Sequence, residues 1–144
     1  MKYLTLIVLL LSAPALSCQP PRYPENYVPP TLEQELETHF RAAAVVYTAF
    51  VTDVNASHLK PSSATLASLE SFKGTPLPSK NISFGCCCPQ DLSFESGAKV
   101  ILFLNSAGAM IHAVPIDGNE AKRWSVDASK TLAILRKLAR ISAD

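Results

Sequence analysis

The hydrophobic and polar positions of the chain follow two periods. Apolar side chains recur about once per helical turn from Leu32 to about Arg41, which predicts a helix with one apolar face. Thr31 precedes this segment as an N-cap, and Gln34 three residues later completes a capping box. A second helix is predicted from about Asp127 to Arg140, with Asp127 as its N-cap.

Between the two helices the period shortens to two, and β-branched and aromatic residues dominate. We predict strands at residues 44–54, 64–72, 81–84, 98–104 and 109–114. The fourth strand is the most apolar and is expected to be central. In the second strand, strict alternation assigns one face to Leu66, Ser68, Glu70 and Phe72.

Five strands flanked by two helices predict a mainly β fold. We expect a small closed barrel or a strongly curved sheet, because closure removes the exposed edges that five strands otherwise leave. The segment Asp117–Asn119 is expected to be a loop, and Trp124 is expected to seal the barrel against the last helix.

The N-terminal part of the chain has a different composition. A positive start is followed by an apolar run from Tyr3 to Leu11 and by small residues before Cys18. This layout is typical of a secretory signal peptide at residues 1–17, since a membrane span needs about 20 apolar residues. Residues 18–30 are predicted to be an extended, proline-rich tether, and residues 31–144 a single domain.

Cys18 has two alternative fates. Cleavage after Ser17 leaves it as a free N-terminal residue of a secreted or periplasmic protein, in a compartment where disulfides form. The run Ala15-Leu16-Ser17-Cys18 also resembles a bacterial lipobox, in which Cys18 carries lipid. Only the lipidated form is expected to associate with a membrane.

Charge and motif content argue against several functions. The formal net charge is +1 and no block of like charges occurs, whereas nucleic-acid binding needs clustered Lys and Arg. The sequence contains no nucleophile elbow, zinc-protease motif or phosphate-binding glycine loop. We therefore expect a protein that is not an enzyme and holds no cofactor.

Three short segments occur in the order found in one known family. They are Leu32–Leu36 followed by Arg41–Tyr47, then Leu69–Gly74, and finally Cys86–Cys88 followed by Phe94–Leu104. This order resembles the netrin-like, or tissue-inhibitor-of-metalloproteinase-like, domains. The resemblance implies a five-stranded OB-type barrel with flanking helices, whose N-terminal cysteine is tied to the barrel by a disulfide.

The same resemblance implies a protein partner, and a metalloprotease is one candidate. The partner would be contacted through the start of the mature chain, at Cys18, Gln19, Pro20 and Pro21. Animal inhibitors of this family begin Cys-x-Cys and chelate the protease zinc through the N-terminal amine and carbonyl. In this chain Pro20 stands where the second cysteine would be.

Cys86, Cys87 and Cys88 are consecutive. Adjacent cysteines rarely bridge each other, because a disulfide needs Cα atoms about 5.5 Å apart. With the resemblance, this predicts one bridge from Cys18 to one of the three. The alternative is a metal-binding or thiol-redox centre, in which the three thiols act with a histidine such as His112.

The histidines are otherwise expected to have no special role. His39 lies at the edge of the predicted first helix and His58 in a polar loop, so both are expected to be solvated. His112 falls in the fifth strand and is expected to be half-exposed.

Overall fold

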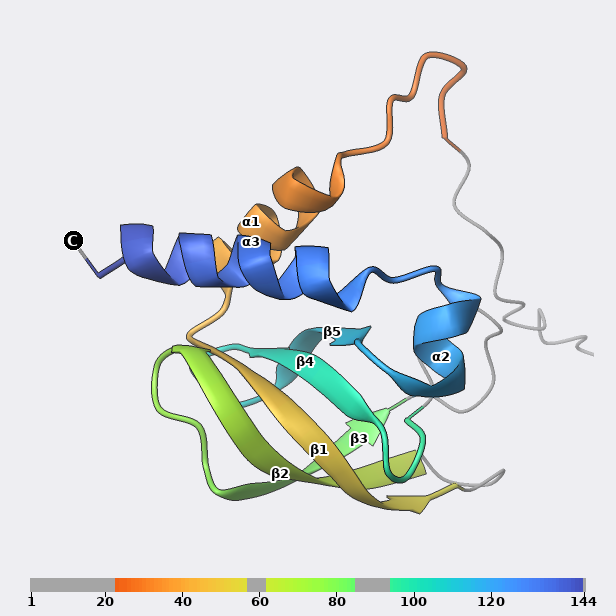
Figure 1. Ribbon diagram of the computed structural model, residues 1–144, viewed down its shortest axis with the longest axis vertical. Coiled ribbons are helices and arrows are strands. Elements are labelled where there is room, and N and C mark those ends of the chain that lie inside the picture. The colour runs from red at the N-terminus through yellow and green to blue at the C-terminus, as the bar shows by residue number, and fades with distance from the viewer. Residues whose placement is uncertain (1–22, 57–61, 85–93, 144) are drawn as a thin grey trace, which may run out of the picture.

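A computed structural model describes residues 23–56, 62–84 and 94–143. These residues form one antiparallel sheet of five strands, with one helix before the first strand and two after the last (Figure 1). The helices are α1 (Leu32–Ala42), α2 (Gly118–Arg123) and α3 (Ala128–Ile141). The strands are β1 (Val45–Asn55), β2 (Ser62–Lys73), β3 (Ser79–Phe84), β4 (Lys99–Leu104) and β5 (Met110–Pro115). The predicted mainly β class is confirmed.

Several predictions concern residues outside the described ranges, and they stay predictions. They are the signal peptide at residues 1–17, the tether residues Gln19, Pro20 and Pro21, His58, and the four cysteines Cys18, Cys86, Cys87 and Cys88. Among the helices of the described ranges, none has both the length and the apolar content needed to cross a bilayer.

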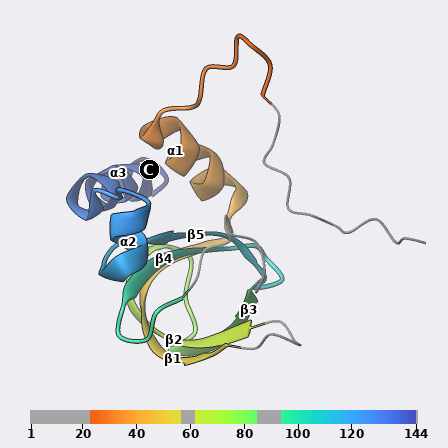
Figure 2. The ribbon, with the colours of Figure 1, turned by 90° about the vertical axis from the view of Figure 1, so that its right-hand side faces the viewer.

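The strands are ordered β3-β2-β1-β4-β5 across the sheet. Strand β4 returns beside β1, so the order β4-β1-β2-β3 is that of a Greek key. The predicted fourth strand is an interior strand, although β1 is the middle strand of the five. β4 is paired on both sides. Figure 2 shows that the sheet is strongly curved, with a concave side and an outer side on which the helices lie.

The sheet separates two hydrophobic clusters. The first lies on its concave side and includes Tyr47, Val51, Leu66, Val100 and Leu102. The second lies between the sheet and the helices and includes Leu36, Phe40, Phe72, Ile101, Phe103 and Leu135. Alternate β4 side chains enter the two clusters, which explains why this strand is a continuous apolar run.

The expected alternation in the second strand is wrong at its end. Leu66 packs in the concave cluster, whereas Phe72 packs in the helix-facing cluster. The cause is a register shift, because β2 carries one more residue than β1 between the pairs Ala49–Ser68 and Tyr47–Ser71. One extra residue turns every later side chain to the opposite face.

Both predicted N-caps are confirmed. Thr31 Oγ1 accepts a hydrogen bond from the Gln34 amide at 3.3 Å, and the Gln34 side chain accepts from the Thr31 amide at 2.9 Å. The carboxylate of Asp127 accepts from the Lys130 amide at 3.0 Å. These caps satisfy amides that the first turn of a helix leaves without partners.

The expected loop at Asp117–Asn119 is instead the start of α2. The Glu95 carboxylate accepts hydrogen bonds from the Asn119 amide at 2.9 Å and from its side chain at 2.7 Å. These long-range contacts position the first turn of a helix of six residues, which is too short to form alone.

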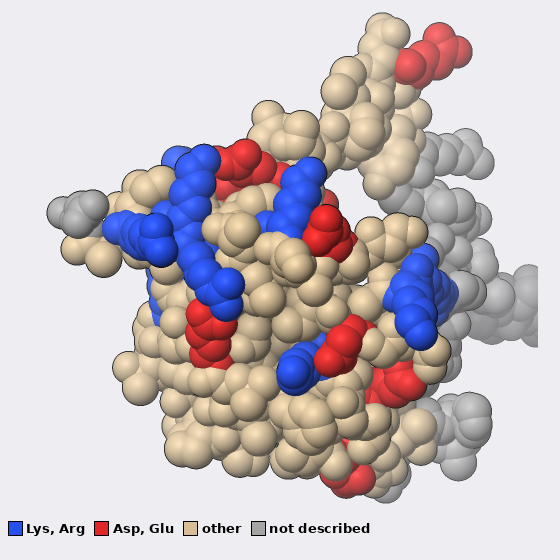
Figure 3. All heavy atoms as spheres, in the orientation of Figure 1, with Lys and Arg blue, Asp and Glu red and all other residues tan. Residues whose placement is uncertain are grey.

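Helix α3 is linked to the rest of the fold by ion pairs. Arg136 makes a two-bond contact with Glu70 on β2, at 3.0 and 2.9 Å, and Lys137 contacts Glu33 on α1 at 2.8 Å. Figure 3 accordingly shows Lys and Arg side chains gathered over the α3 region, with acidic side chains beside them. The pKa values of Glu33 and Glu70 are lowered, mainly by hydrogen bonds from Lys137 and Arg136.

Candidate functional site

A cleft of about 800 Å³ lies between α1, β5 and the segment that joins α2 to α3. Most of its lining is apolar, with Leu36 and Val114 among the lining residues. Glu35 and His112 add polar groups to the same wall. A concave, mainly apolar site with a few polar groups is the usual form of a ligand-binding cleft.

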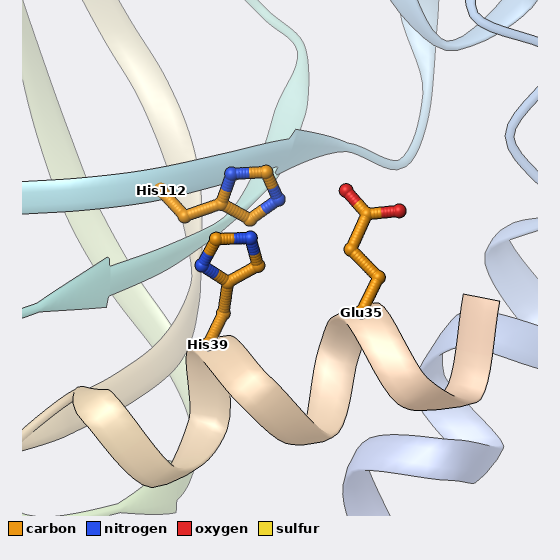
Figure 4. Close-up of side chains that lie close together, drawn as sticks. All are labelled: Glu35, His39 and His112. Atoms are coloured by element: carbon orange, nitrogen blue, oxygen red, sulfur yellow. The ribbon is translucent and has the colours of Figure 1, made fainter. Parts of the chain in front are cut away.

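His39 lies next to Glu35 and His112, and the three side chains form one cluster (Figure 4). Glu35 and His39 are four residues apart on α1, which brings them to one face of the helix. His112 lies on β5. One ligand-capable atom from each side chain lies within 4.8 Å of the other two.

The two imidazole rings stack face to face. Their centroids are 3.8 Å apart and their planes differ by 7°. The buried ring of Phe103 on β4 lies beside both, at 6.0 Å from His39 and 5.5 Å from His112. The two imidazole rings therefore pack against the hydrophobic cluster between the sheet and α1, to which Phe103 belongs.

Burial, and to a smaller extent the neighbouring His39, lowers the pKa of His112 from 6.5 to about 4. His112 is consequently neutral at pH 7, with a lone pair on one ring nitrogen. Across the described part of the chain, no hydrogen bond or ion pair engages the side chains of Glu35, His39 or His112. Their polar atoms are available to a ligand.

The histidine predictions have different outcomes. His112 is partly buried, as expected for a half-exposed strand residue. The prediction that His39 is solvated was wrong, because its ring is partly buried and covered by His112. The alternative centre that combines His112 with Cys86, Cys87 and Cys88 stays a prediction, because the three cysteines lie outside the described residues.

Trp124 lies at the cleft and does not seal the barrel, so that prediction was wrong. It remains 45% exposed, and its Nε1 donates a hydrogen bond to Glu120 at 3.0 Å. The guanidinium of Arg123 lies 5.5 Å from its ring centroid. These contacts hold the indole on the surface at the edge of the cleft.

The Glu35–His39–His112 cluster is not evident as a unit from the sequence. The spacing of Glu35 and His39 was a usable signal, whereas the approach of His112 depends on how α1 packs over the sheet. No protein-family model matches the chain, and a comparison with curated proteins found no match.

Proposed function

We propose that the chain is an exported, non-enzymatic protein-interaction module of the netrin-like class, built on an OB-type barrel. The observation that carries this proposal is the strand order β3-β2-β1-β4-β5, with one helix before β1 and two after β5. An OB-fold is a five-stranded, partly open Greek-key barrel. The Greek key formed by β4-β1-β2-β3 is compatible with that architecture.

Contacts between the edges of the sheet support a barrel. Ile82 on β3 belongs to the concave cluster, and Met110 and Ala113 on β5 pack against the same cluster. Lys80 on β3 also reaches the β4–β5 turn, where its Nζ lies 3.1 Å from the position that a Cβ on Gly108 would take. These contacts are compatible with edge strands that face one common interior.

The tether supports a role in protein binding. Its described part, residues 23–30, precedes α1 and is exposed throughout. Tyr23 and Val28 are 59% and 83% exposed, and the rings of Tyr23 and Tyr27 stack with centroids 4.2 Å apart. Exposed aromatic residues are enriched at protein interfaces. The tether leads back to Cys18–Pro21, which the family resemblance implicates in partner contact.

Inhibition assays test the metalloprotease version of the proposal. The chain beginning at Cys18 is compared with one that carries an extra alanine before Cys18, against a panel of zinc endopeptidases. We expect only the first to inhibit, because the extension removes the α-amine from its place on the cysteine. Equal inhibition by both would refute the role of that amine, and inhibition by neither would refute the inhibitor version.

A disulfide map of the protein from its own host tests the tether itself. We expect one bridge from Cys18 to Cys86, Cys87 or Cys88. A diacylglyceryl mass on Cys18 would instead identify a lipoprotein with membrane-anchored function, and it would exclude the free-amine mechanism. A thiol titration of the unreduced protein that found reactive thiols at all four cysteines would contradict the tether.

A further inference from the structure

We propose that Glu35, His39 and His112 form a binding site for a divalent transition-metal ion of the Zn²⁺ class. The site uses no cysteine and is independent of the proposed interaction function. It rests on three side chains from two elements that converge on one another, two of which, Glu35 and His112, line the cleft.

The ligand set favours this class of metal. Two imidazole nitrogens and one carboxylate oxygen suit zinc, copper or nickel, whereas Mg²⁺ and Ca²⁺ favour shells made of oxygen. Three protein ligands leave a fourth position open in a tetrahedral zinc site. Because Glu35 and His112 line the cleft, water or a small ligand can reach that position.

The distances require only local movement. Ligand atoms around a tetrahedral zinc ion lie about 3.3 Å apart, since each is about 2.0–2.1 Å from the metal. The present limit of 4.8 Å is therefore too wide by about 1.5 Å. Glu35 is exposed, and rotation about its side-chain bonds together with rotation of one imidazole ring can supply this contraction without movement of α1.

The stack of His39 and His112 must open when the metal binds. An imidazole lone pair lies in the plane of its ring, and the two planes differ by only 7°. The two lone pairs therefore lie in two separate, nearly parallel planes that do not meet at one ion, so at least one ring must turn for both nitrogens to bind it. Loss of the stack is thus a specific structural consequence of occupancy.

Metal titration of the mature full-length chain tests the site. Co²⁺ is added first because a bound thiolate gives an intense near-ultraviolet charge-transfer band, whereas nitrogen and oxygen ligands do not. Zn²⁺ affinity is then measured by competition with a chromophoric chelator. We expect one equivalent of bound metal without the thiolate band, and perturbed ring resonances of His39 and His112 in NMR spectra.

Variants assign the ligands. Glu35→Gln keeps an exposed polar side chain and is expected to lower Zn²⁺ affinity at least tenfold, since even loss of groups that only orient ligands costs about 10–100-fold. His39→Ala and His112→Ala should each lower it further. Glu37→Gln is the matched control, because it removes the same charge from α1 at a residue that pairs with Arg41. Its affinity should not change.

Three outcomes would overturn the inference. These are no stoichiometric binding, a thiolate band on Co²⁺, or equal affinity in Glu35→Gln and the unaltered chain. The Glu35→Gln result remains decisive if the histidine variants fail to fold, because Glu35 is exposed. None of these outcomes bears on protease inhibition by the Cys18 end.

Discussion

The ammonium of Lys73 donates a hydrogen bond to the main-chain carbonyl of Phe40 at 2.8 Å and lies 5.3 Å from the centroid of its ring. The same ammonium donates to the Ala43 carbonyl at 2.6 Å. Lys73 at the end of β2 thus caps the C-terminal end of α1, where unpaired carbonyls and the helix dipole favour a cation.

We expect Lys73→Met to lower the free energy of unfolding by about 1.5–3 kcal/mol, the usual contribution of hydrogen bonds from a charged group. Methionine keeps much of the aliphatic stem and removes the donor. Urea denaturation measures the change. Lys99→Met on the exposed side of β4 is the control and should have little effect. An equal loss in both variants would contradict the capping role.

Gly74 should not tolerate a side chain. Its φ is +65°, and a Cβ would lie 2.6 Å from the Ala44 carbonyl oxygen. Gly97 has a φ of +87° and open space around the same position. We expect Gly97→Ala to lower the free energy of unfolding by about 1–2 kcal/mol, the cost of the left-handed conformation alone. Gly74→Ala should lower it clearly more, because its side chain also meets the Ala44 carbonyl oxygen. Thermal denaturation of both variants checks this, and equal losses would refute the close approach.

Tyr47→Phe should leave stability unchanged or raise it by about 1–2 kcal/mol. Among the described residues, the Tyr47 hydroxyl is buried without a hydrogen-bond partner, and burial raises its pKa. Removal of the hydroxyl abolishes that desolvation cost and retains the ring. Tyr27→Phe, on the exposed tether, is the control. A lower free energy of unfolding for Tyr47→Phe in chemical denaturation would mean that the Tyr47 hydroxyl has a hydrogen-bond partner.

His112 should make metal-free protein less stable in mild acid. Folding lowers its pKa from 6.5 to about 4, so between these values the unfolded chain binds a proton that the folded chain does not. The free energy of unfolding should therefore fall as pH decreases from about 6.5 to about 4, by about 3 kcal/mol. Above pH 6.5 this group has no further effect.

Denaturation at a series of pH values, with a chelator present, measures this dependence. Glu35 and His39 both face the His112 ring. Protonation of the salt-bridged carboxylates Glu33 and Glu70, whose pKa values are lowered in the folded protein, also destabilises the protein in acid. Comparison with His112→Gln isolates the histidine contribution. Parallel curves for the two proteins would show that the His112 pKa is not lowered by folding.

Most elements of the fold could be predicted because their signals are local. The capping box at Thr31 and the apolar spacing after it specify α1, and β-branched alternation specifies β1. The exceptions depend on other parts of the chain. α2 starts where Glu95 accepts its hydrogen bonds, and Trp124 remains exposed because Glu120 and Arg123 hold it at the surface.

The candidate site likewise depends on both local and long-range contacts. A helix period is enough to align Glu35 with His39, because residues four apart share a helix face. Nothing near His112 in the sequence indicates that β5 passes beneath α1.

Local periodicity and capping thus define the elements, because each depends on neighbouring residues in the chain. The strand order, the shift that turns Phe72 toward the helices and the stack of His39 on His112 were decided only by the tertiary structure. The physical reason is that a hydrophobic pattern specifies which side chains are buried, but not which distant element covers them.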